Sequence, residues 1–116
     1  MKYLMILNDP PYGNERTYNG LRLANSLAKR DATTVYVFLT GDAVCAGLAG
    51  QTTPNGYYNI ERMLKGLAPQ GVAIGVCGSC MDARGIKSDS LAEGVHRSSL
   101  DELTSWTNEV DKVLVF

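Results

Sequence analysis

The sequence lacks an excess of charge of either sign and lacks a long apolar run, and each of these absences argues against a class of function. Its 11 basic and 12 acidic residues are interspersed, and the formal net charge is −1. A nucleic-acid-binding module carries a basic patch or stripe, so no direct nucleic-acid partner is expected. The longest apolar stretches, such as residues 35–39, fall far below the roughly 20 residues of a membrane-spanning helix, so no membrane partner is expected.

Motifs for nucleotide binding and for serine hydrolysis are also missing. The chain contains no G-x-x-x-x-G-K-[ST] phosphate loop, no G-x-G-x-x-G after its first apolar run and no G-x-S-x-G elbow. His96 is the single histidine, which leaves a serine triad with little support. Nothing indicates nucleotide-dependent catalysis, and we expect no cofactor.

Length and composition suit one globular domain spanning residues 1–116. The apolar fraction of 45% and the charged fraction of 20% are ordinary values for such domains. Residues 1–7 resemble the start of a signal peptide, but Asn8-Asp9-Pro10-Pro11 ends the apolar run too early for a cleavable leader. We interpret this run as a first strand and expect the protein to be cytoplasmic.

Strand-like and helix-like segments alternate along the chain. Continuous apolar runs predict strands buried on both faces, over residues 2–8, 33–39, 72–76 and 112–116. Helical spacing of apolar residues predicts helices over 15–30 and 60–67, a short helix over 81–84, and a capped helix from Ser99 to Val110. Residues 88–97 are ambiguous between a helical turn and a short strand near Val95. The alternation predicts an α/β fold, a three-layer sandwich around a mostly parallel five-stranded sheet.

Ligands of open α/β sheets bind outside the carboxyl ends of the strands. The segments 8–14, 39–45 and 77–84 should gather there, and Cys45, Cys77 and Cys80 fall in or next to them. Candidate binding residues in these segments are Asn8, Asp9, Tyr12, Asp42, Gly78 and Ser79. Ordinary turn or capping roles are the alternative for the first four of these.

Cys77 is the candidate catalytic residue, because it lies between a buried strand and a helix start. Backbone N–H groups that point at its sulfur would stabilise a thiolate, and Arg84 would add positive charge. Gly78 would let a partner approach closely. These features favour a nucleophile that accepts sulfur as a persulfide. The alternative is a buried structural cysteine, since free cysteine is among the most buried residue types.

Cys80 completes a C-x-x-C spacing with Cys77. This spacing is also that of dithiol redox motifs, so Cys80 is a candidate resolving thiol, and a small packed thiol is the alternative. Cys45, Cys77, Cys80 and His96 together would supply a Cys₃His set for zinc. Structural zinc sites usually show paired short ligand spacings, which are absent here, so we predict no metal site.

The chain resembles the DsrE/DsrF-like family over nearly its whole length. The resemblance rests on the apolar strand that ends in Asn8-Asp9-Pro10, on residues 35–44, and on the strand 72–76 with Cys77 at its end. It continues through Ala83-Arg84-Gly85-Ile86, residues 98–103 and residues 111–116. The spacing from Cys77 to Gly85 is similar to that around the sulfur-carrying cysteine of TusD-like subunits. Cys80 departs from that pattern, which has a small residue there.

The resemblance implies a sulfur-relay protein that assembles as a homotrimer or homohexamer and exchanges sulfur with donor and acceptor proteins. Cys77 would then accept and pass on persulfide sulfur, in the manner of a sulfurtransferase or sulfur carrier. Two other functions stay open. One is a non-catalytic oligomeric binding or regulatory subunit, and the other is a dithiol redox protein that uses Cys77 and Cys80.

Overall fold

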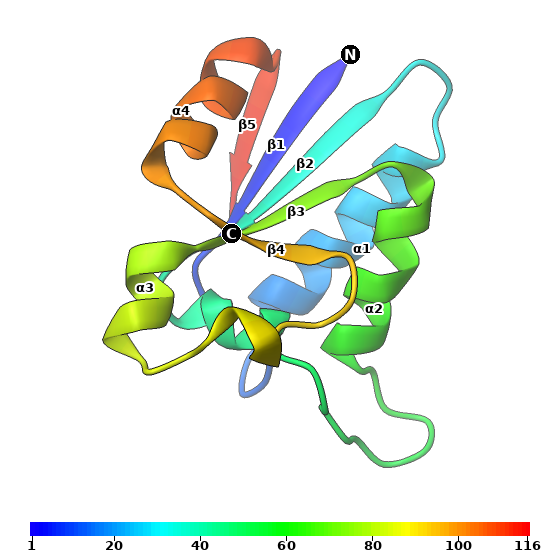
Figure 1. Cartoon of the computed structure of the whole chain (residues 1–116). Coiled ribbons are helices and arrows are strands. Elements are labelled where there is room, and N and C mark those ends of the chain that lie inside the picture. The colour runs from blue at the N-terminus through cyan, green and yellow to red at the C-terminus, as the bar shows by residue number, and fades with distance from the viewer.

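A five-stranded parallel sheet forms the middle layer of the computed structural model, which describes all residues, 1–116 (Figure 1). Its strands are β1 (Lys2–Leu7), β2 (Thr34–Leu39), β3 (Ala73–Cys77), β4 (Val95–Ser98) and β5 (Lys112–Val115). The order across the sheet is β4-β3-β2-β1-β5, and every neighbouring pair is parallel. The predicted fold class is therefore confirmed, and the ambiguous segment before residue 98 contains the edge strand β4.

Helices cover both faces of this sheet. They are α1 (Arg16–Ala28), α2 (Ile60–Leu67), α3 (Gly78–Ala83) and α4 (Leu100–Glu109), and a 3₁₀ helix, η1 (Gly41–Gly47), follows β2. Figure 1 shows α1 and α2 on one face, α4 on the other, and α3 beyond the end of the strands. The helix α3 begins at Gly78, earlier than the predicted 81, because the Cys77 side chain caps its first turn. None of these helices has both the length and the apolar character needed to cross a membrane.

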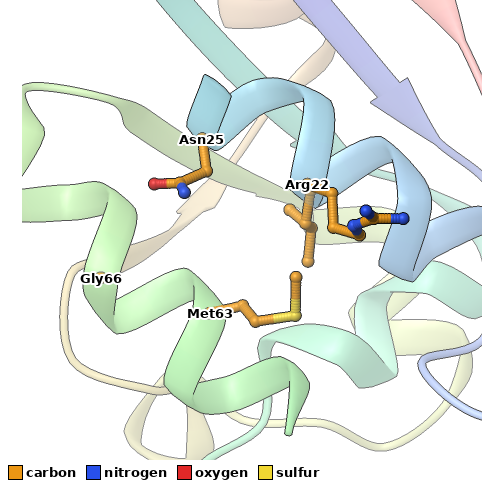
Figure 2. A pocket seen from close by; sticks show the side chains of 5 residues that line it. Arg22, Asn25, Met63 and Gly66 are labelled. Carbon is orange, nitrogen blue, oxygen red and sulfur yellow. The ribbon is translucent and has the colours of Figure 1, made fainter. Parts of the chain in front are cut away.

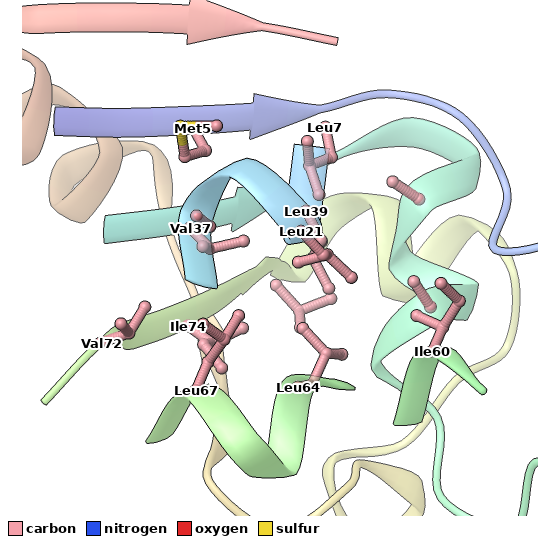
Figure 3. Packing of buried hydrophobic residues seen from close by; sticks show 14 of the residues in the cluster. Met5, Leu7, Leu21, Val37, Leu39, Ile60, Leu64, Leu67, Val72 and Ile74 are labelled. Atoms are coloured by element: carbon pink, nitrogen blue, oxygen red, sulfur yellow. The ribbon is translucent and has the colours of Figure 1, made fainter. Parts of the chain in front are cut away.

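The larger part of the core lies between the sheet and the pair α1 and α2 (Figure 3). Alternate strand residues, among them Val37, Leu39 and Ile74, point to this face and are fully buried. They meet Leu21 of α1 and Leu64 of α2, which helical spacing brings to the inner side of each helix. Burial on this scale holds the three parallel strands β1, β2 and β3 in register.

A smaller core lies under α4, and Trp106 is its centre. The indole ring stacks on Tyr36 at 4.8 Å between ring centroids and meets the edge of Phe38 at 6.3 Å. Gly75 makes room for it, because a Cβ atom at this position would lie 3.2 Å from the Trp106 ring and 2.9 Å from Ser98 Cβ. The absence of a side chain at Gly75 thus allows α4 to approach β3 and β4 closely.

We predict that Trp106→Ala lowers the free energy of unfolding by about 3–5 kcal/mol, because it removes a large ring from a packed site. Leu100→Ala is the matched control on the same helix: Leu100 is 76% exposed whereas Trp106 is 8% exposed. The control should stay within about 0.5 kcal/mol of the wild type. Urea unfolding followed by circular dichroism measures both, and equal losses for the two variants would contradict the packing of α4.

Candidate active site

Cys77 is the last residue of β3 and the N-cap of α3. Its sulfur accepts a hydrogen bond from the Cys80 backbone N–H at 3.4 Å and lies 3.3 Å from the Ser79 hydroxyl oxygen. Strand alternation directs its side chain to the same face as Gly75, the face covered by α4. The result is a half-buried sulfur that receives polar hydrogens from its own helix and stays partly open to solvent.

Cys80 lies one turn later and contacts the loop after β2. Its sulfur accepts the Gly41 N–H at 3.3 Å and lies 3.6 Å from the Thr40 hydroxyl oxygen. Gly41 has a φ of +57°, which a residue with a side chain rarely adopts, and this conformation lets η1 begin beside the sulfur. The three cysteines are all free thiols in the structure.

The pKa of the Cys77 thiol is lowered from its ordinary value. Burial alone raises this pKa, but hydrogen bonds from the Cys80 side chain, the Ser79 hydroxyl, the Cys80 N–H and the Thr40 side chain outweigh it. A lower pKa increases the fraction of thiolate near neutral pH, and the thiolate is the nucleophilic form of cysteine.

A pocket of about 450 Å³ opens beside the Cys77 sulfur, between α3, the end of β4 and the first turn of α4. Its wall combines apolar and hydroxyl-bearing side chains with one guanidinium; the lining residues are Phe38, Thr40, Cys77, Gly78, Ser79, Arg97, Ser98, Ser99, Leu100 and Leu103. Cys77 is the only cysteine in this wall. The pocket therefore opens onto Cys77, and Cys80 lies outside its wall.

Arg97 supplies the positive charge nearest to this pocket. Both of its terminal nitrogens donate to the Asp82 carboxylate, at 2.9 and 3.0 Å, and its charge interacts with that of Cys77. Gly78 permits this approach, because a Cβ atom there would lie 3.0 Å from the Arg97 guanidinium and 2.8 Å from the Ser98 carbonyl oxygen. Sequence patterns do not point to Arg97 as a site residue, because only the pairing of β4 with β3 brings it beside Cys77.

Arg84, the cation that the sequence placed beside Cys77, lies on the other side of α3. It donates to the Cys80 carbonyl oxygen at 3.1 Å and to the Asp42 carboxylate at 2.8 Å. The cysteine charges that act on its guanidinium are those of Cys80 and Cys45. Asp42 thus ties η1 to the end of α3, and neither residue lines the pocket.

Asn8, Asp9 and Tyr12 do not reach the pocket, although their loop lies at the same edge of the sheet. The Asn8 amide donates to the Phe116 carbonyl oxygen, and Asp9 pairs with Arg16 at 3.0 Å. Tyr12 donates its hydroxyl hydrogen to Gln51 and stacks on Tyr58. Of the candidate binding residues, Gly78 and Ser79 are the two that the structure brings to the Cys77 pocket.

The cysteines and His96 do not come together as a metal site. The structure contains no group of three or more His, Cys, Asp or Glu side chains arranged to hold a metal ion. His96 pairs instead with Glu102 of α4 and meets the edge of the Trp106 ring. Cys45 packs against the larger core from η1.

Figure 2 shows a second hollow, of about 340 Å³, between α1 and α2. Arg22 and Asn25 of α1 face Met63 and Gly66 of α2 across it, and Leu21 completes the wall. No cysteine, histidine or carboxylate lines this hollow, so it holds no nucleophile or general base. Of these two hollows, the one beside Cys77 is therefore the candidate active site.

The fold and the site define a parallel α/β sandwich in which a cysteine with a lowered pKa lines a pocket at the end of a central strand. The model of the DsrE/DsrF-like family matches residues 1–116, and the chain belongs to this family. It is 43% identical to Protein YchN of Escherichia coli K12 over 116 residues, which cover 99% of this chain and 98% of that protein. It is 34% identical to the uncharacterized protein MK0008 of Methanopyrus kandleri, covering 97% and 91% of the two chains.

Solved structures agree with this assignment. The crystal structure of ychN protein from E. coli superposes with a TM-score of 0.93 and covers 100% of this chain and 99% of that one. The protein of unknown function MTH1491 from Methanobacterium thermoautotrophicum superposes with a TM-score of 0.75 at 17% identity, over 99% and 98% of the two chains. The second likeness concerns the fold alone.

We predict that iodoacetamide alkylates Cys77 with a midpoint at lower pH than an unperturbed cysteine, because hydrogen bonds lower the pKa of this thiol. Ser79→Ala should raise the midpoint, since one donor is lost. Ser105→Ala, an exposed serine of α4, should leave it unchanged. Tandem mass spectrometry of the peptide that contains both Cys77 and Cys80 separates the two sites. Identical midpoints for wild type and Ser79→Ala would refute the role given to the Ser79 hydroxyl.

Proposed function

We propose that this chain is an intracellular sulfur-trafficking protein, a sulfurtransferase or sulfur carrier in which Cys77 accepts persulfide sulfur and passes it on. The observation that carries this proposal is the environment of the Cys77 sulfur. The Cys77 sulfur accepts hydrogen bonds that lower the pKa of the thiol, and it also lines an open pocket of about 450 Å³. Membership of the DsrE/DsrF-like family is consistent with such a role.

The acceptance step needs only the Cys77 thiolate and a sulfane donor. The thiolate attacks the outer sulfur of a donor persulfide, or of thiosulfate, and a new S–S bond forms at Cys77 Sγ. The donor's own S–S bond breaks, and its thiolate or sulfite leaves with the electron pair. The Ser79 hydroxyl and the Cys80 N–H remain beside the sulfur throughout, and Arg97 offsets negative charge at the pocket.

The rim of the pocket suits contact with donor and acceptor proteins. Leu100 is 76% exposed at its edge, and Leu103 continues the apolar strip along α4. Exposed apolar side chains beside a reactive group favour contact with a protein surface. A partner that carries its sulfur on a cysteine would cover Leu100 while its thiol enters the pocket.

Self-assembly as a homotrimer or homohexamer belongs to the same proposal. The strand β5 is at the edge of the sheet, and its residues Val113 and Val115 are 40% and 64% exposed. An exposed edge strand can pair with another chain, and exposed apolar side chains favour contact with another protein surface.

We predict a particle mass of three or six chains in multi-angle light scattering. Val115→Lys should shift the distribution toward smaller particles, because a charge replaces an exposed apolar contact. A monomer for the wild type across the accessible concentration range would overturn this part of the proposal.

Sulfur loading tests the function itself. Cys45→Ser/Cys80→Ser keeps Cys77 as the sole thiol, and Cys77→Ser/Cys80→Ser removes it while keeping Cys45. After incubation with thiosulfate, polysulfide or glutathione persulfide, we predict that intact-mass spectrometry shows one added sulfur on the first variant. The second variant should show none. If the first variant gains no sulfur from any donor, the carrier function is wrong and a non-catalytic binding subunit is favoured.

A further inference from the structure

Cys80 lies in the first turn of α3, three residues after the cysteine that the proposed function loads. Its backbone N–H donates to Cys77 Sγ at 3.4 Å, and its side chain is among the groups that lower the pKa of the Cys77 thiol. It does not line the pocket, which is reached through Cys77. The second thiol therefore lies within the same helical turn as Cys77, whereas the pocket wall includes Cys77 and not Cys80.

We propose that Cys80 discharges the Cys77 persulfide by forming a Cys77–Cys80 disulfide and releasing the carried sulfur as sulfide. This inference rests on the proposed function, because it needs a persulfide on Cys77. It gives the chain a further activity, the reduction of sulfane sulfur to sulfide. The C-x-x-C spacing is that of dithiols which form such bridges reversibly.

The step balances without an external oxidant. The Cys80 thiolate attacks Cys77 Sγ, and the bond between Cys77 Sγ and the outer sulfur breaks. The outer sulfur leaves with the electron pair and its proton as hydrosulfide. In this step the Cys80 sulfur is oxidised and the carried sulfur is reduced to sulfide, while Cys77 Sγ, already oxidised by loading, exchanges one S–S bond for another. A dithiol reductant then restores both thiols.

The direction of attack follows from the placement of the two sulfurs. Displacement at sulfur requires the nucleophile and the leaving group on opposite sides of the attacked atom. The outer sulfur of a Cys77 persulfide would extend into the pocket, whereas Cys80 lies outside the pocket wall, in the helical turn whose N–H donates to the inner sulfur. Attack on the inner sulfur therefore expels sulfide toward solvent, and it does not move the sulfur onto Cys80.

The loop after β2 holds Cys80 in this position. The Gly41 N–H and the Thr40 hydroxyl both lie at its sulfur, at 3.3 and 3.6 Å. The ion pair between Asp42 and Arg84 joins the same loop to the end of α3. These contacts fix the turn that carries Cys80, so the second thiol stays within reach of the first.

A single-turnover experiment tests the inference. Fully reduced protein is mixed anaerobically with one equivalent of the donor that loads Cys45→Ser/Cys80→Ser, and sulfide is trapped with monobromobimane. We predict that the wild type releases one sulfide for each sulfur it accepts and loses two hydrogens from the peptide that contains Cys77 and Cys80. Cys80→Ser should retain the persulfide and lose this release, because serine cannot form the bridge.

Cys45→Ser is the matched control, since it removes the third thiol outside the pocket, and it should release sulfide as the wild type does. If the wild type holds its persulfide as long as Cys80→Ser does, the inference is overturned while the carrier function stands. Transfer of the sulfur to Cys80 without sulfide release also overturns it. If no donor loads the variant that keeps only Cys77, the proposed carrier function itself is wrong, and this result is distinct from the loss of sulfide release.

Discussion

The site depends on the contact between Trp106 and Gly75. The indole can lie this close to β3 only because position 75 has no side chain, and a single Cβ atom there would collide with Ser98 as well. This contact sets the height of α4 above the sheet, and the first turn of α4 forms one wall of the pocket. A larger residue at position 75 would move Leu100 and Leu103 away from Cys77. Dense packing of the smaller core is thus a condition for the shape of the pocket.

The two thiols near the end of β3 lie in different environments. Cys77 faces the α4 side and the pocket, whereas Cys80 contacts the loop after β2. Only the first is accessible to a substrate held in the pocket, and only the second is held by Thr40 and Gly41. This difference between the two environments underlies the two steps that we propose, loading of sulfur at Cys77 and its release by Cys80.

Family membership and mechanism rest on different observations. The fold is shared with a chain of 17% identity, so the sandwich as such says little about the chemistry. The chemistry depends on a few side chains around one strand end, and on the hydrogen bonds that lower the pKa of the Cys77 thiol. The relationship to YchN, at 43% identity over nearly the whole length, makes that protein a natural comparison for the same loading experiments.

Much of the fold could be predicted from local patterns. Apolar runs and helical spacing identified four of the strands and the three longer helices. A strand buried on both faces leaves a continuous apolar run, whereas a helix buried on one face leaves apolar residues three or four positions apart. The parallel sheet followed from the alternation, and it placed Cys77 at a strand end. The short edge strand β4 stayed ambiguous, since three of its four residues, Val95–Ser98, are polar and the strand pairs on one side only.

The sequence by itself determined which residues are the candidates for the chemistry, since thiols and their C-x-x-C spacing are visible without a structure. Only the tertiary structure decided which charge stands beside which sulfur. Arg84 is the neighbour in sequence, but it is held by Asp42, whereas Arg97 arrives beside Cys77 across the β3–β4 pair. Electrostatic and hydrogen-bonding contacts depend on distance in space, and a chain that folds into a sheet brings together residues whose separation in sequence gives no sign of it.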